Sequence, residues 1–340
     1  MPMILAEGLT KDYKVYQRGS GLWGSVSTLL SRRSTTMRAV DNVSFSIEAG
    51  ASVAYIGPNG AGKSSTIKML TGIMKPSAGH CEVAGIVPWR ERVRNAANIG
   101  VVFGQRSQLW WDLPVIDSFA ILRRIYDIPT ATYDKNMALF RSLLAIDELA
   151  LVPVRKLSLG QRMRIEIAAS FLHDPRVVFL DEPTIGLDAL LKEAIRKLVR
   201  HMHREVGTTI VLTSHDMDDI KQICDDVIVI DKSRVVYQGT LAQLNRMERH
   251  RCMVLEFSPT PAAEAALVLL AHALPGIDAV AREGAGRVRI RFLPERLALQ
   301  ALMAWLSARI EVLELYSPEP DLESIIRQVY LHGIPERLSA

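Results

Sequence analysis

Residues Gly57 to Ser64 follow the pattern G-x-x-x-x-G-K-S, whose residue types suit the binding of phosphate groups. Glycines let backbone N–H groups approach phosphate oxygens closely, Lys63 brings a positive charge, and the Ser64 hydroxyl is an oxygen ligand of the kind that Mg²⁺ prefers. An apolar run, Ser52–Ile56, precedes the pattern and a helical run, Ser65–Thr71, follows it, so we expect a strand–loop–helix unit that binds phosphate. Its expected contact residues are Gly57, Pro58, Asn59, Gly60, Ala61, Gly62, Lys63, Ser64 and Ser65.

Two acids stand at the end of another apolar run, Val177–Leu180. We expect Asp181 to bind Mg²⁺, directly or through water, and Glu182 to polarise an attacking water as a general base. An acidic turn after a strand is common in proteins. The phosphate loop upstream in the same chain favours the catalytic interpretation.

The elements that position these residues follow an α/β pattern. Three short apolar runs, Ser52–Ile56, Val177–Leu180 and Thr209–Thr213, are typical of parallel strands that are covered on both faces. Helical segments such as Ala189–Glu205 separate the runs, so we predict a largely parallel sheet. Ala39–Ile47 is instead expected to be an antiparallel strand.

Two further regions have recognisable patterns. Val227–Ile230 and Val235–Tyr237 are separated by a short polar segment and predict a hairpin. The middle of the chain, Asp117–Leu151, is mostly helical by pattern and is interrupted at Pro129.

The composition shifts after about Gly239, where Leu241–His250 has the pattern of a charged helical connector. Beyond it, a β-α-β-α-β pattern predicts a small α+β domain. Its expected elements are Met253–Phe257, Ala262–Leu274, Arg287–Phe292, Leu297–Ala308 and Glu311–Tyr316. This domain has no catalytic constellation in its sequence, so we expect it to be regulatory or to stabilise a dimer.

Composition limits the class of protein. The chain has 340 residues, 49% of them hydrophobic, which is enough for a sizeable core and argues against wholesale disorder. Its three cysteines are far apart, so neither a disulfide framework nor a zinc site is indicated. No stretch is apolar enough to cross a bilayer, and the N-terminus lacks the features of a signal peptide, so a soluble or peripheral protein is expected. The formal net charge of +4 is too small to identify a partner.

A third motif, Leu157-Ser-Leu-Gly-Gln161, lies between the phosphate loop and the acidic pair. The order of the three motifs resembles that of ATP-binding-cassette (ABC) ATPases, over residues from about 3 to 240. In this resemblance Gly57–Ser64 is similar to the Walker A motif, Gln105 to the Q-loop, Leu157–Gln161 to the signature, Val177–Glu182 to Walker B, Gly186–Asp188 to the D-loop, His215 to the H-loop, and Tyr13 to the aromatic A-loop residue.

The resemblance implies a P-loop ABC nucleotide-binding domain with a parallel-sheet core, an antiparallel β subdomain and a helical subdomain. The expected boundaries are 1–240 for this domain, with a helical subdomain at about 106–172 and an insert at about 17–38. A linker at 241–252 then leads to a small α+β accessory domain at 253–335. The insert is rich in basic residues and has apolar residues on one face of a possible helix, so it could lie at a membrane surface or on a permease. A mobile loop, or a helix packed on its own domain, is the alternative.

The resemblance also implies roles for residues. Two chains would pair head to tail, with each ATP held between one phosphate loop and the signature of the other chain, formed by Ser158, Leu159, Gly160 and Gln161. Glu182, His215 and Gln105 would be catalytic, with Ser64, Gln105 and Asp181 as Mg²⁺ ligands. Tyr13 would stack on adenine, and Asp188 belongs to the D-loop. The common signature has glycine where this chain has Leu159, a departure that matters only if the position requires a positive φ.

The expected function is that of the ATP-hydrolysing motor of an ABC transporter, peripheral on the cytoplasmic side of the bacterial inner membrane. Its partners would be separately encoded membrane permeases and a second copy of itself or a homologous ATPase subunit. Segments 104–114 and 319–326 resemble drug-exporter ATPases of the daunorubicin and sodium-efflux types, which implies export. Trp110 or Trp111 is a candidate contact to a permease, although both could simply pack in the helical subdomain.

Two other functions were weighed against transport. A soluble ABC ATPase that acts on nucleic acid or ribosomes is an alternative, but the single cassette and the lack of a heptad run argue against it, so no nucleic-acid partner is expected. A small-molecule kinase or GTPase would lack the signature motif.

Overall fold

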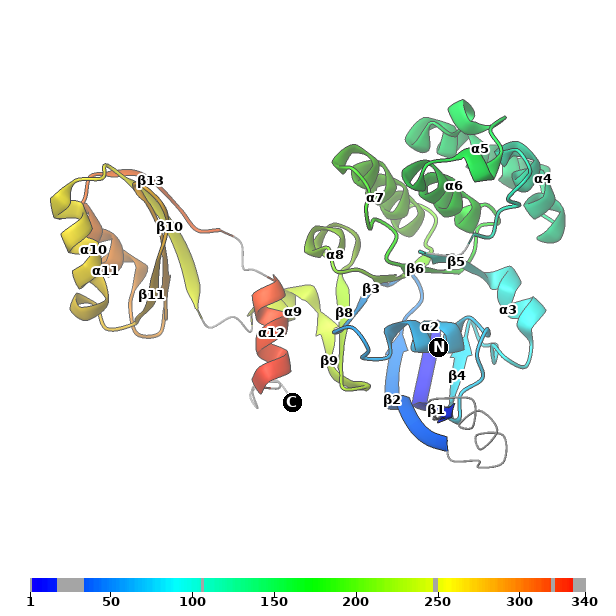
Figure 1. The fold of residues 1–340 in the computed structure, drawn as a ribbon, viewed down its shortest axis with the longest axis horizontal. Helices are drawn as coiled ribbons and strands as arrows, with labels where there is room; N and C mark the ends of the chain where they lie inside the picture. The colour runs from blue at the N-terminus through cyan, green and yellow to red at the C-terminus, as the bar shows by residue number, and fades with distance from the viewer. Residues whose placement is uncertain (1, 17–33, 105–106, 247–249, 319–321, 333–340) are drawn as a thin grey trace, which may run out of the picture. The chain divides into compact units, whose positions relative to one another are not determined.

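The computed structural model describes residues 2–16, 34–104, 107–246, 250–318 and 322–332. The chain divides into two compact units, a larger one at Met1–Leu241 and a smaller one at Ala242–Ala340 (Figure 1). The smaller unit therefore begins at the start of the linker expected at 241–252, where the structure has a short helix, α9 (Leu241–Arg246).

A six-stranded sheet forms the centre of the larger unit. Its order is β5-β6-β7-β3-β8-β9, and all neighbours are parallel except β8 and β9, which pair antiparallel as the predicted hairpin. β3 and β7 are buried along their whole length, which explains why their sequences are continuous apolar runs. The strands are β3 (Ser52–Ile56), β5 (Ile99–Phe103), β6 (Val177–Asp181), β7 (Thr209–Thr213), β8 (Asp226–Asp231) and β9 (Arg234–Thr240).

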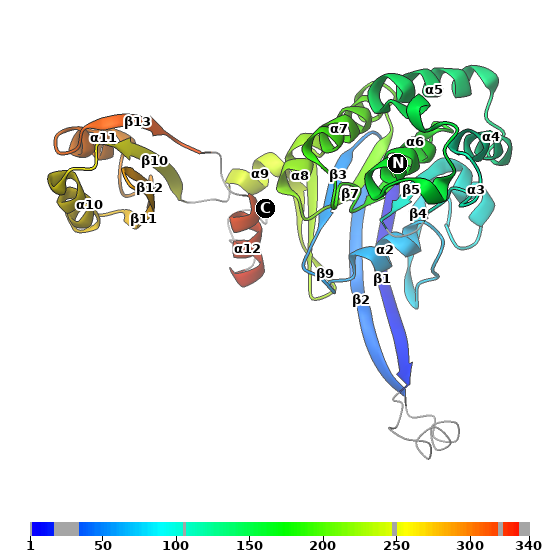
Figure 2. The same ribbon diagram turned by 45° about the horizontal axis from the view of Figure 1, so that its top comes forward.

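A second sheet, antiparallel and three-stranded, has the order β2-β1-β4. Its strands are β1 (Ile4–Tyr16), β2 (Ser34–Ile47) and β4 (Ala78–Val83), and β2 contains the strand expected at Ala39–Ile47. Side chains from this sheet, from α2 (Lys63–Leu70) and from β3 share one buried core, so the phosphate-loop helix is packed between two sheets. In Figure 2, β1 and β2 extend as a long ribbon from the body of the unit.

Residues 17–33 of the expected insert lie outside the described residues. The last residues of that insert, 34–38, belong to β2, where Ser34 pairs with Tyr16 of β1.

Helices make up the region after β5. It contains α4 (Val115–Ile125), α5 (Thr130–Leu144) and α6 (Leu159–Phe171), together with two 3-10 helices at Ile146–Leu149 and Val154–Lys156. The predicted break at Pro129 is confirmed, because Pro129 is the N-cap of α5. The other helices of the larger unit are α3 (Arg92–Asn98), α7 (Ala189–Arg204) and α8 (Met217–Ile223). Figures 1 and 2 show α6 and α7 side by side.

The smaller unit has a four-stranded antiparallel sheet with the order β11-β12-β10-β13. Two of its helices, α10 and α11, pack their apolar residues on this sheet around one core. Its elements are β10 (Arg251–Phe257), α10 (Pro261–Ala273), β11 (Ile277–Gly284), β12 (Arg287–Phe292), α11 (Leu299–Ser307), β13 (Val312–Tyr316) and α12 (Leu322–His332).

The predicted β-α-β-α-β pattern was wrong by one strand, because the structure has β-α-β-β-α-β before α12. The missed strand is β11, which lies at the edge of the sheet and has only partly buried or exposed side chains. Its partly buried residues, such as Ile277 and Val280, do not alternate strictly with exposed ones, so the strand lacks the alternation by which strands are predicted.

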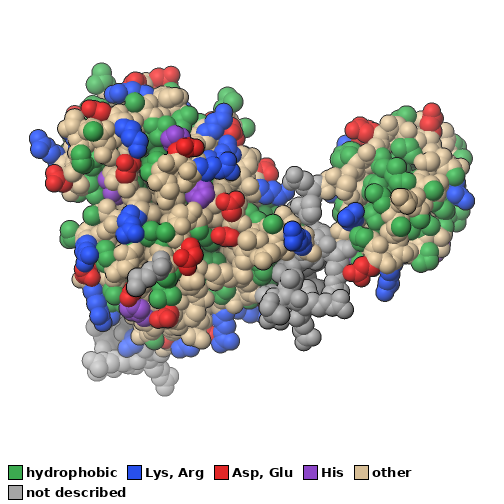
Figure 3. Space-filling model, turned by 180° about the vertical axis from the view of Figure 1, so that it is seen from behind, with side chains coloured by type: hydrophobic (Ala, Val, Ile, Leu, Met, Phe, Trp, Pro, Cys, Tyr) green, Lys and Arg blue, Asp and Glu red, His purple; other side chains and the backbone are tan. Residues whose placement is uncertain are grey.

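In the described part of the chain, no helix is long and apolar enough to cross a membrane. On the face of the larger unit seen in Figure 3, Lys and Arg side chains are interspersed with Asp and Glu, whereas the visible face of the smaller unit has many hydrophobic side chains.

Candidate functional site

The phosphate loop connects β3 to α2 and requires glycine at defined positions. Gly62 has a φ of +99°, and a Cβ atom there would stand 2.4 Å from the carbonyl oxygen of Ala39. At Gly57, a Cβ atom would stand 2.5 Å from the carbonyl oxygen of Ile230. A side chain at either position would therefore displace backbone, so the loop keeps its shape only with glycine.

Lys63 begins α2, and its ammonium group points back into the loop. Its Nζ donates to the carbonyl oxygen of Pro58 at 3.2 Å and also contacts that of Gly57. Burial lowers the pKa of Lys63, while the charges of Glu182 and Asp181 oppose this shift. A cation in this position can neutralise phosphate oxygens held by the loop.

Ser64 and Asp181 come together from elements that are far apart in the sequence. Ser64 Oγ donates to Asp181 Oδ2 at 3.3 Å, and Thr213 Oγ1 donates to Asp181 Oδ1 at 2.6 Å. A hydroxyl beside a carboxylate is a pair of hard oxygen donors, which fits Mg²⁺. Within the described residues, no cluster of three or more His, Cys, Asp or Glu could hold a metal by itself. A magnesium ion here would need phosphate oxygens and waters as its remaining ligands.

Glu182 follows β6 in a conformation that is rare for a residue with a side chain. Its φ is +55°, and its N–H donates to the carbonyl oxygen of Thr213 at 3.0 Å, which fixes this turn to β7. The left-handed region costs an ordinary residue roughly 1–2 kcal/mol. Its Oε1 atom is buried and has no hydrogen-bond partner among the described residues. A buried carboxylate oxygen without a donor is suited to accept a hydrogen bond from a bound water.

His215 lies opposite Glu182 at the end of β7. Its Nε2 is 3.5 Å from Glu182 Oε1 and 3.2 Å from Asn59 Oδ1, and its backbone N–H donates to Glu182 Oε2 at 3.4 Å. His215 therefore links the phosphate loop to the acidic pair. Its side chain is 53% exposed, so the imidazole can reach a ligand in the site.

Tyr13 of β1 lies beside the first turn of α2. Its hydroxyl is 3.4 Å from Ser65 Oγ and donates to Met74 Sδ at 3.2 Å, while the Lys11 ammonium lies 5.7 Å from its ring centroid. An aromatic ring at the edge of a phosphate loop can stack on a nucleobase.

The signature residues form the start of α6. Ser158 is the N-cap, with its Oγ accepting from the N–H of Gln161 at 3.2 Å and its own N–H donating to Gln161 Oε1 at 2.9 Å. The Ser158 hydroxyl proton is not used in this capping box and stays available to a phosphate oxygen. Leu159 is the first helical residue and is not among the residues with positive φ, so the position does not require glycine.

The D-loop lies next to the signature in the same chain. Gly186 has a φ of +72°, and a Cβ atom there would lie 3.6 Å from Leu159 Cδ2. Asp188 caps α7, its Oδ1 accepting from the N–H of Leu191 at 2.9 Å. Leu191 Cδ2 in turn is 3.0 Å from where a Cβ atom of Gly160 would stand, so side chains of the D-loop region pack on the signature turn.

Sequence reasoning missed a buried network behind the site. The Asp219 carboxylate accepts hydrogen bonds from the hydroxyls of Thr184 and Ser214 and from Arg196 Nε, the last at 2.7 Å. Thr184 follows the acidic pair and Ser214 precedes His215, so one carboxylate connects the loop that carries Glu182 with the loop that carries His215. Nothing in the local pattern of the sequence distinguishes Asp219 from the neighbouring Asp218.

Gln105, which the sequence predicts as a catalytic residue and Mg²⁺ ligand, lies outside the described residues. The other predicted residues fall into two groups in the chain. Tyr13, the phosphate loop, Asp181, Glu182 and His215 are linked by the contacts above, whereas the hydrogen bonds of Ser158 are to Gln161 within the exposed signature turn.

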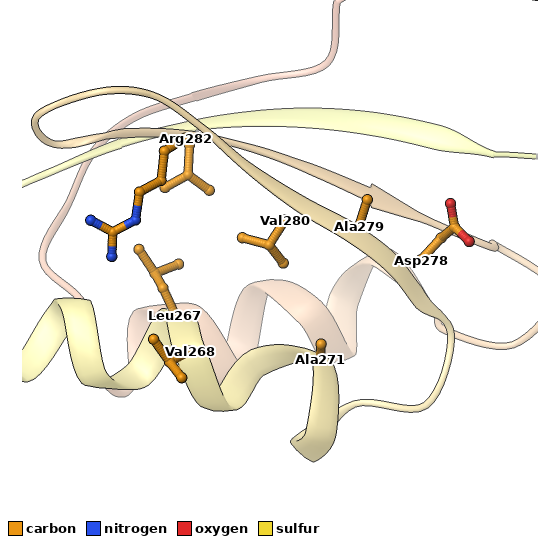
Figure 4. Close-up of a pocket in the computed structure, with 8 residues that line it drawn as sticks. Leu267, Val268, Ala271, Asp278, Ala279, Val280 and Arg282 are labelled. Atoms are coloured by element: carbon orange, nitrogen blue, oxygen red, sulfur yellow. The ribbon is translucent and has the colours of Figure 1, made fainter.

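The smaller unit has a surface groove of about 310 Å³ between α10 and β11 (Figure 4). Leu267, Val268 and Ala271 line one side of it. The charged residues at the groove already have partners, because Asp278 pairs with Arg291 and Arg282 pairs with Glu264. This groove therefore offers an apolar lining without a set of free catalytic groups.

Comparisons with known proteins all lead to one family, that of ABC transporters. The family model described as "ABC transporter" matches residues 40–185. Nod factor export ATP-binding protein I of Ralstonia nicotianae is 36% identical over 210 residues, which are 62% of this chain and 65% of that protein, slightly less than two thirds of its length. Methionine import ATP-binding protein MetN 2 of Yersinia pestis is 31% identical over 261 residues, which cover 73% of this chain and 79% of that protein.

A solved structure supports the fold. A dimeric ATP-binding cassette in a post-hydrolysis state, bound to ADP and Pi, has a TM-score of 0.59 and 23% identity, covering 70% of this chain and 99% of that chain. The predicted combination of a parallel-sheet core with antiparallel and helical parts is confirmed by this likeness and by the sheets described above.

Proposed function

Because the chain belongs to the ABC transporter family and carries its ATP-binding cassette, which is an ATPase domain, we propose that it is the motor subunit of a transporter whose permease subunits are separate polypeptides. The observation that carries the chemistry is the juxtaposition of Glu182 and His215 beside the phosphate loop. ATP and Mg²⁺ are the ligands that this site fits.

Each residue of the site has its own role in the proposed hydrolysis of ATP. The loop and Lys63 hold the phosphates, and Ser64 and Asp181 are placed to bind the magnesium ion, which would neutralise charge on the phosphate oxygens. Glu182 orients a water and accepts its proton as the oxygen attacks the γ-phosphorus and ADP leaves. His215 keeps Glu182 in position and can donate to the γ-phosphate.

A second chain would complete the site. The exposed signature turn presents the Ser158 hydroxyl and the N-terminus of α6, two features that stabilise anions. Three exposed apolar side chains, Leu159, Ile185 and Leu190, stand on the signature turn and beside the D-loop. Exposed apolar residues of this kind favour burial against a partner, which supports pairing with a second copy or a homologous subunit.

The permease contact that we propose is Trp111. Its side chain is 51% exposed and lies against the Arg162 guanidinium, 5.9 Å from the ring centroid. Trp110 is less exposed than Trp111, and its backbone N–H donates to Ser118 Oγ at 3.3 Å, which ties this turn to α4. A peripheral location at the membrane follows from this proposal.

We propose export as the direction of transport. The proposal is supported by the likeness of segment 104–114 to drug-exporter ATPases and by a relative named for export, whereas another relative is named for import. Transport of a labelled compound by the assembled complex in inside-out vesicles, with uptake into the vesicle expected, tests the direction.

Purification of the tagged chain from its native membranes tests the function as a whole. A polytopic membrane protein should co-purify in stoichiometric amount and stimulate ATP hydrolysis. Co-purification with ribosomes or nucleic acid instead, lost on nuclease treatment, would favour the soluble alternative.

A further inference from the structure

The segment that follows Gln105 is fastened to the helix that begins with the signature. Ser107 and Gln108 bond to Glu166, and Trp111 lies against Arg162. Arg162 and Glu166 are four residues apart on α6, so they lie on one face of this helix.

Glu166 is the main point of attachment. Its Oε1 accepts a hydrogen bond from the Ser107 hydroxyl, and its Oε2 accepts from the N–H of Gln108 at 3.2 Å. The Gln108 side chain returns to the helix, with Nε2 donating to the carbonyl oxygen of Glu166 at 3.1 Å. Ser107 Oγ also accepts from the N–H of Leu109 at 3.1 Å, so the turn itself is closed by the same hydroxyl.

The burial of Glu166 is unusual for a carboxylate. The residue is only 5% exposed, and burial raises the pKa of Glu166, while the hydrogen bonds from Ser107 and Gln108 and the charge of Arg162 act in the opposite direction. A buried carboxyl group is costly unless its oxygens are paired. An apolar residue at this position would leave the N–H of Gln108 without its acceptor, so the carboxylate and the turn depend on each other.

The position of this attachment along α6 is mechanically significant. Ser158, the first signature residue, caps the same helix about two turns before Glu166. A displacement of the chain at Ser107 would therefore be transmitted through Glu166 to the helix whose N-terminus is the signature. Trp111, the proposed permease contact, belongs to the same attached segment.

We propose that Glu166 is a positioning residue, which couples the segment after Gln105 to the signature turn through its bond to Ser107. This inference rests on the proposed function, because Gln105 would act on the magnesium ion and the signature on the γ-phosphate only in a paired ABC ATPase. The hydrogen bonds of Glu166 are to Ser107 and Gln108 and not to the phosphate loop or the acidic pair, so its loss should change the rate of hydrolysis more than the affinity for ATP.

Four variants of the full chain test the coupling by steady-state ATP hydrolysis and by equilibrium binding of ATP in a Glu182→Gln background. Glu166→Ala and Ser107→Ala should each lower kcat about tenfold or more, with the affinity for ATP within about twofold of the wild type. The double variant should be no slower than the slower single variant, because both remove one bond. Glu166→Gln should recover kcat to within about threefold, since an amide can donate to Ser107 Oγ and accept from the N–H of Gln108.

Ser170→Ala is the matched control. Ser170 is buried on the same helix, and its hydroxyl donates only to Ile167 within α6, so its removal should leave kcat within about twofold. If Ser170→Ala lowers kcat as much as Glu166→Ala, the effect is general loss of helix packing and the inference is wrong.

Two other outcomes would contradict the proposed role of Glu166. Additive losses in the double variant, or a fall in ATP affinity that matches the fall in kcat, would contradict it. If Glu166→Ala does not fold, the exposed Ser107→Ala still decides the question. The assay uses the isolated chain, so its outcome is independent of the membrane-partner experiment that tests the proposed function.

Discussion

His215 Nε2 lies 3.5 Å from Glu182 Oε1 and 3.2 Å from Asn59 Oδ1, so one imidazole bridges the phosphate loop and the acidic pair. The three residues come from the ends of β3, β6 and β7, which are parallel neighbours in the order β6-β7-β3. Because the carboxyl ends of parallel strands meet at one edge of the sheet, residues 156 positions apart in the chain become neighbours there.

Glu182→Gln should lower kcat for ATP by at least about 100-fold, because an amide cannot accept the proton of the attacking water. Binding of ATP should persist, since the loop and Lys63 are unchanged, and an ATP-bound dimer should accumulate in size-exclusion chromatography. Glu193→Gln is the control, because Glu193 is a surface residue of α7 that pairs with Arg200. Hydrolysis near the wild-type rate in Glu182→Gln would show that another group is the base.

His215→Ala should also lower kcat by about 100-fold, because it removes the group that contacts Glu182 and that we propose as a donor to the γ-phosphate. Asn59→Ala removes only one contact of the imidazole and should cost about threefold to tenfold. Steady-state kinetics of both variants at saturating ATP check the order. A larger loss in Asn59→Ala than in His215→Ala would mean that Asn59 acts on the nucleotide by itself.

Much of this site was predictable from the sequence because its strands are buried in the centre of the sheet. β3 and β7 have the predicted bounds, since a strand buried on both faces is a continuous apolar run that ends where burial ends. The phosphate loop follows from residue types alone. By contrast, β11 has no fully buried residue, and no local pattern marked it as a strand.

The contacts between side chains were not predictable in the same way. Glu166 and Asp219 are charged residues on helices, and by pattern both would be expected at the surface. Only the tertiary structure shows that Asp219 is 0% exposed and that Glu166 faces the turn at Ser107. The positive φ of Glu182 likewise results from its bonds to β7 and leaves no mark in the sequence.

His173 makes the stability of the helical region depend on pH. It stacks on Tyr126 with ring centroids 4.0 Å apart, and its Nε2 lies 3.0 Å from the carbonyl oxygen of Ile99. Burial lowers the pKa of His173 from 6.5 to about 4. Between pH 6.5 and about pH 4 the native state therefore binds fewer protons than the unfolded state. The contribution of the neutral His173 to the free energy of unfolding is fully present above pH 6.5 and is lost as the pH falls towards 4.

The variant His173→Phe isolates this effect, because it keeps an aromatic ring against Tyr126 and removes the titrating group. Between pH 7 and pH 4, the wild type should lose up to about 3 kcal/mol more of its unfolding free energy than the variant. Urea unfolding at each pH measures the difference. Parallel pH profiles for the two proteins would contradict the assignment.

Trp111→Ala should weaken association with the permease, because it removes a large exposed aromatic side chain. Retention on immobilised permease complex should fall at least about tenfold, while ATP affinity of the isolated chain is unchanged. Trp110→Ala is the comparison, since the Trp110 side chain is partly buried in its own chain, so its loss should lower the melting temperature rather than the retention. Equal retention of Trp111→Ala and wild type would remove Trp111 from the interface.

Leu159→Gly restores the residue of the common signature and tests whether this chain needs its leucine. Leu159 has helical backbone angles as the first residue of α6, so glycine relieves no strain and lowers helix propensity by up to about 1 kcal/mol. It also removes the Leu159 side chain, which lies beside Gly186 of the D-loop and is an exposed apolar group of the proposed dimer surface. We therefore expect ATP-dependent dimerisation to weaken about threefold or more, with kcat at saturating protein within about threefold of the wild type.

Ser158→Ala is the comparison, because it removes the donor that we propose for the γ-phosphate and should lower kcat itself. Analytical ultracentrifugation, combined with hydrolysis rates at several protein concentrations, separates an effect on dimerisation from an effect on kcat. Faster hydrolysis and a tighter dimer in Leu159→Gly would show that Leu159 impairs the signature.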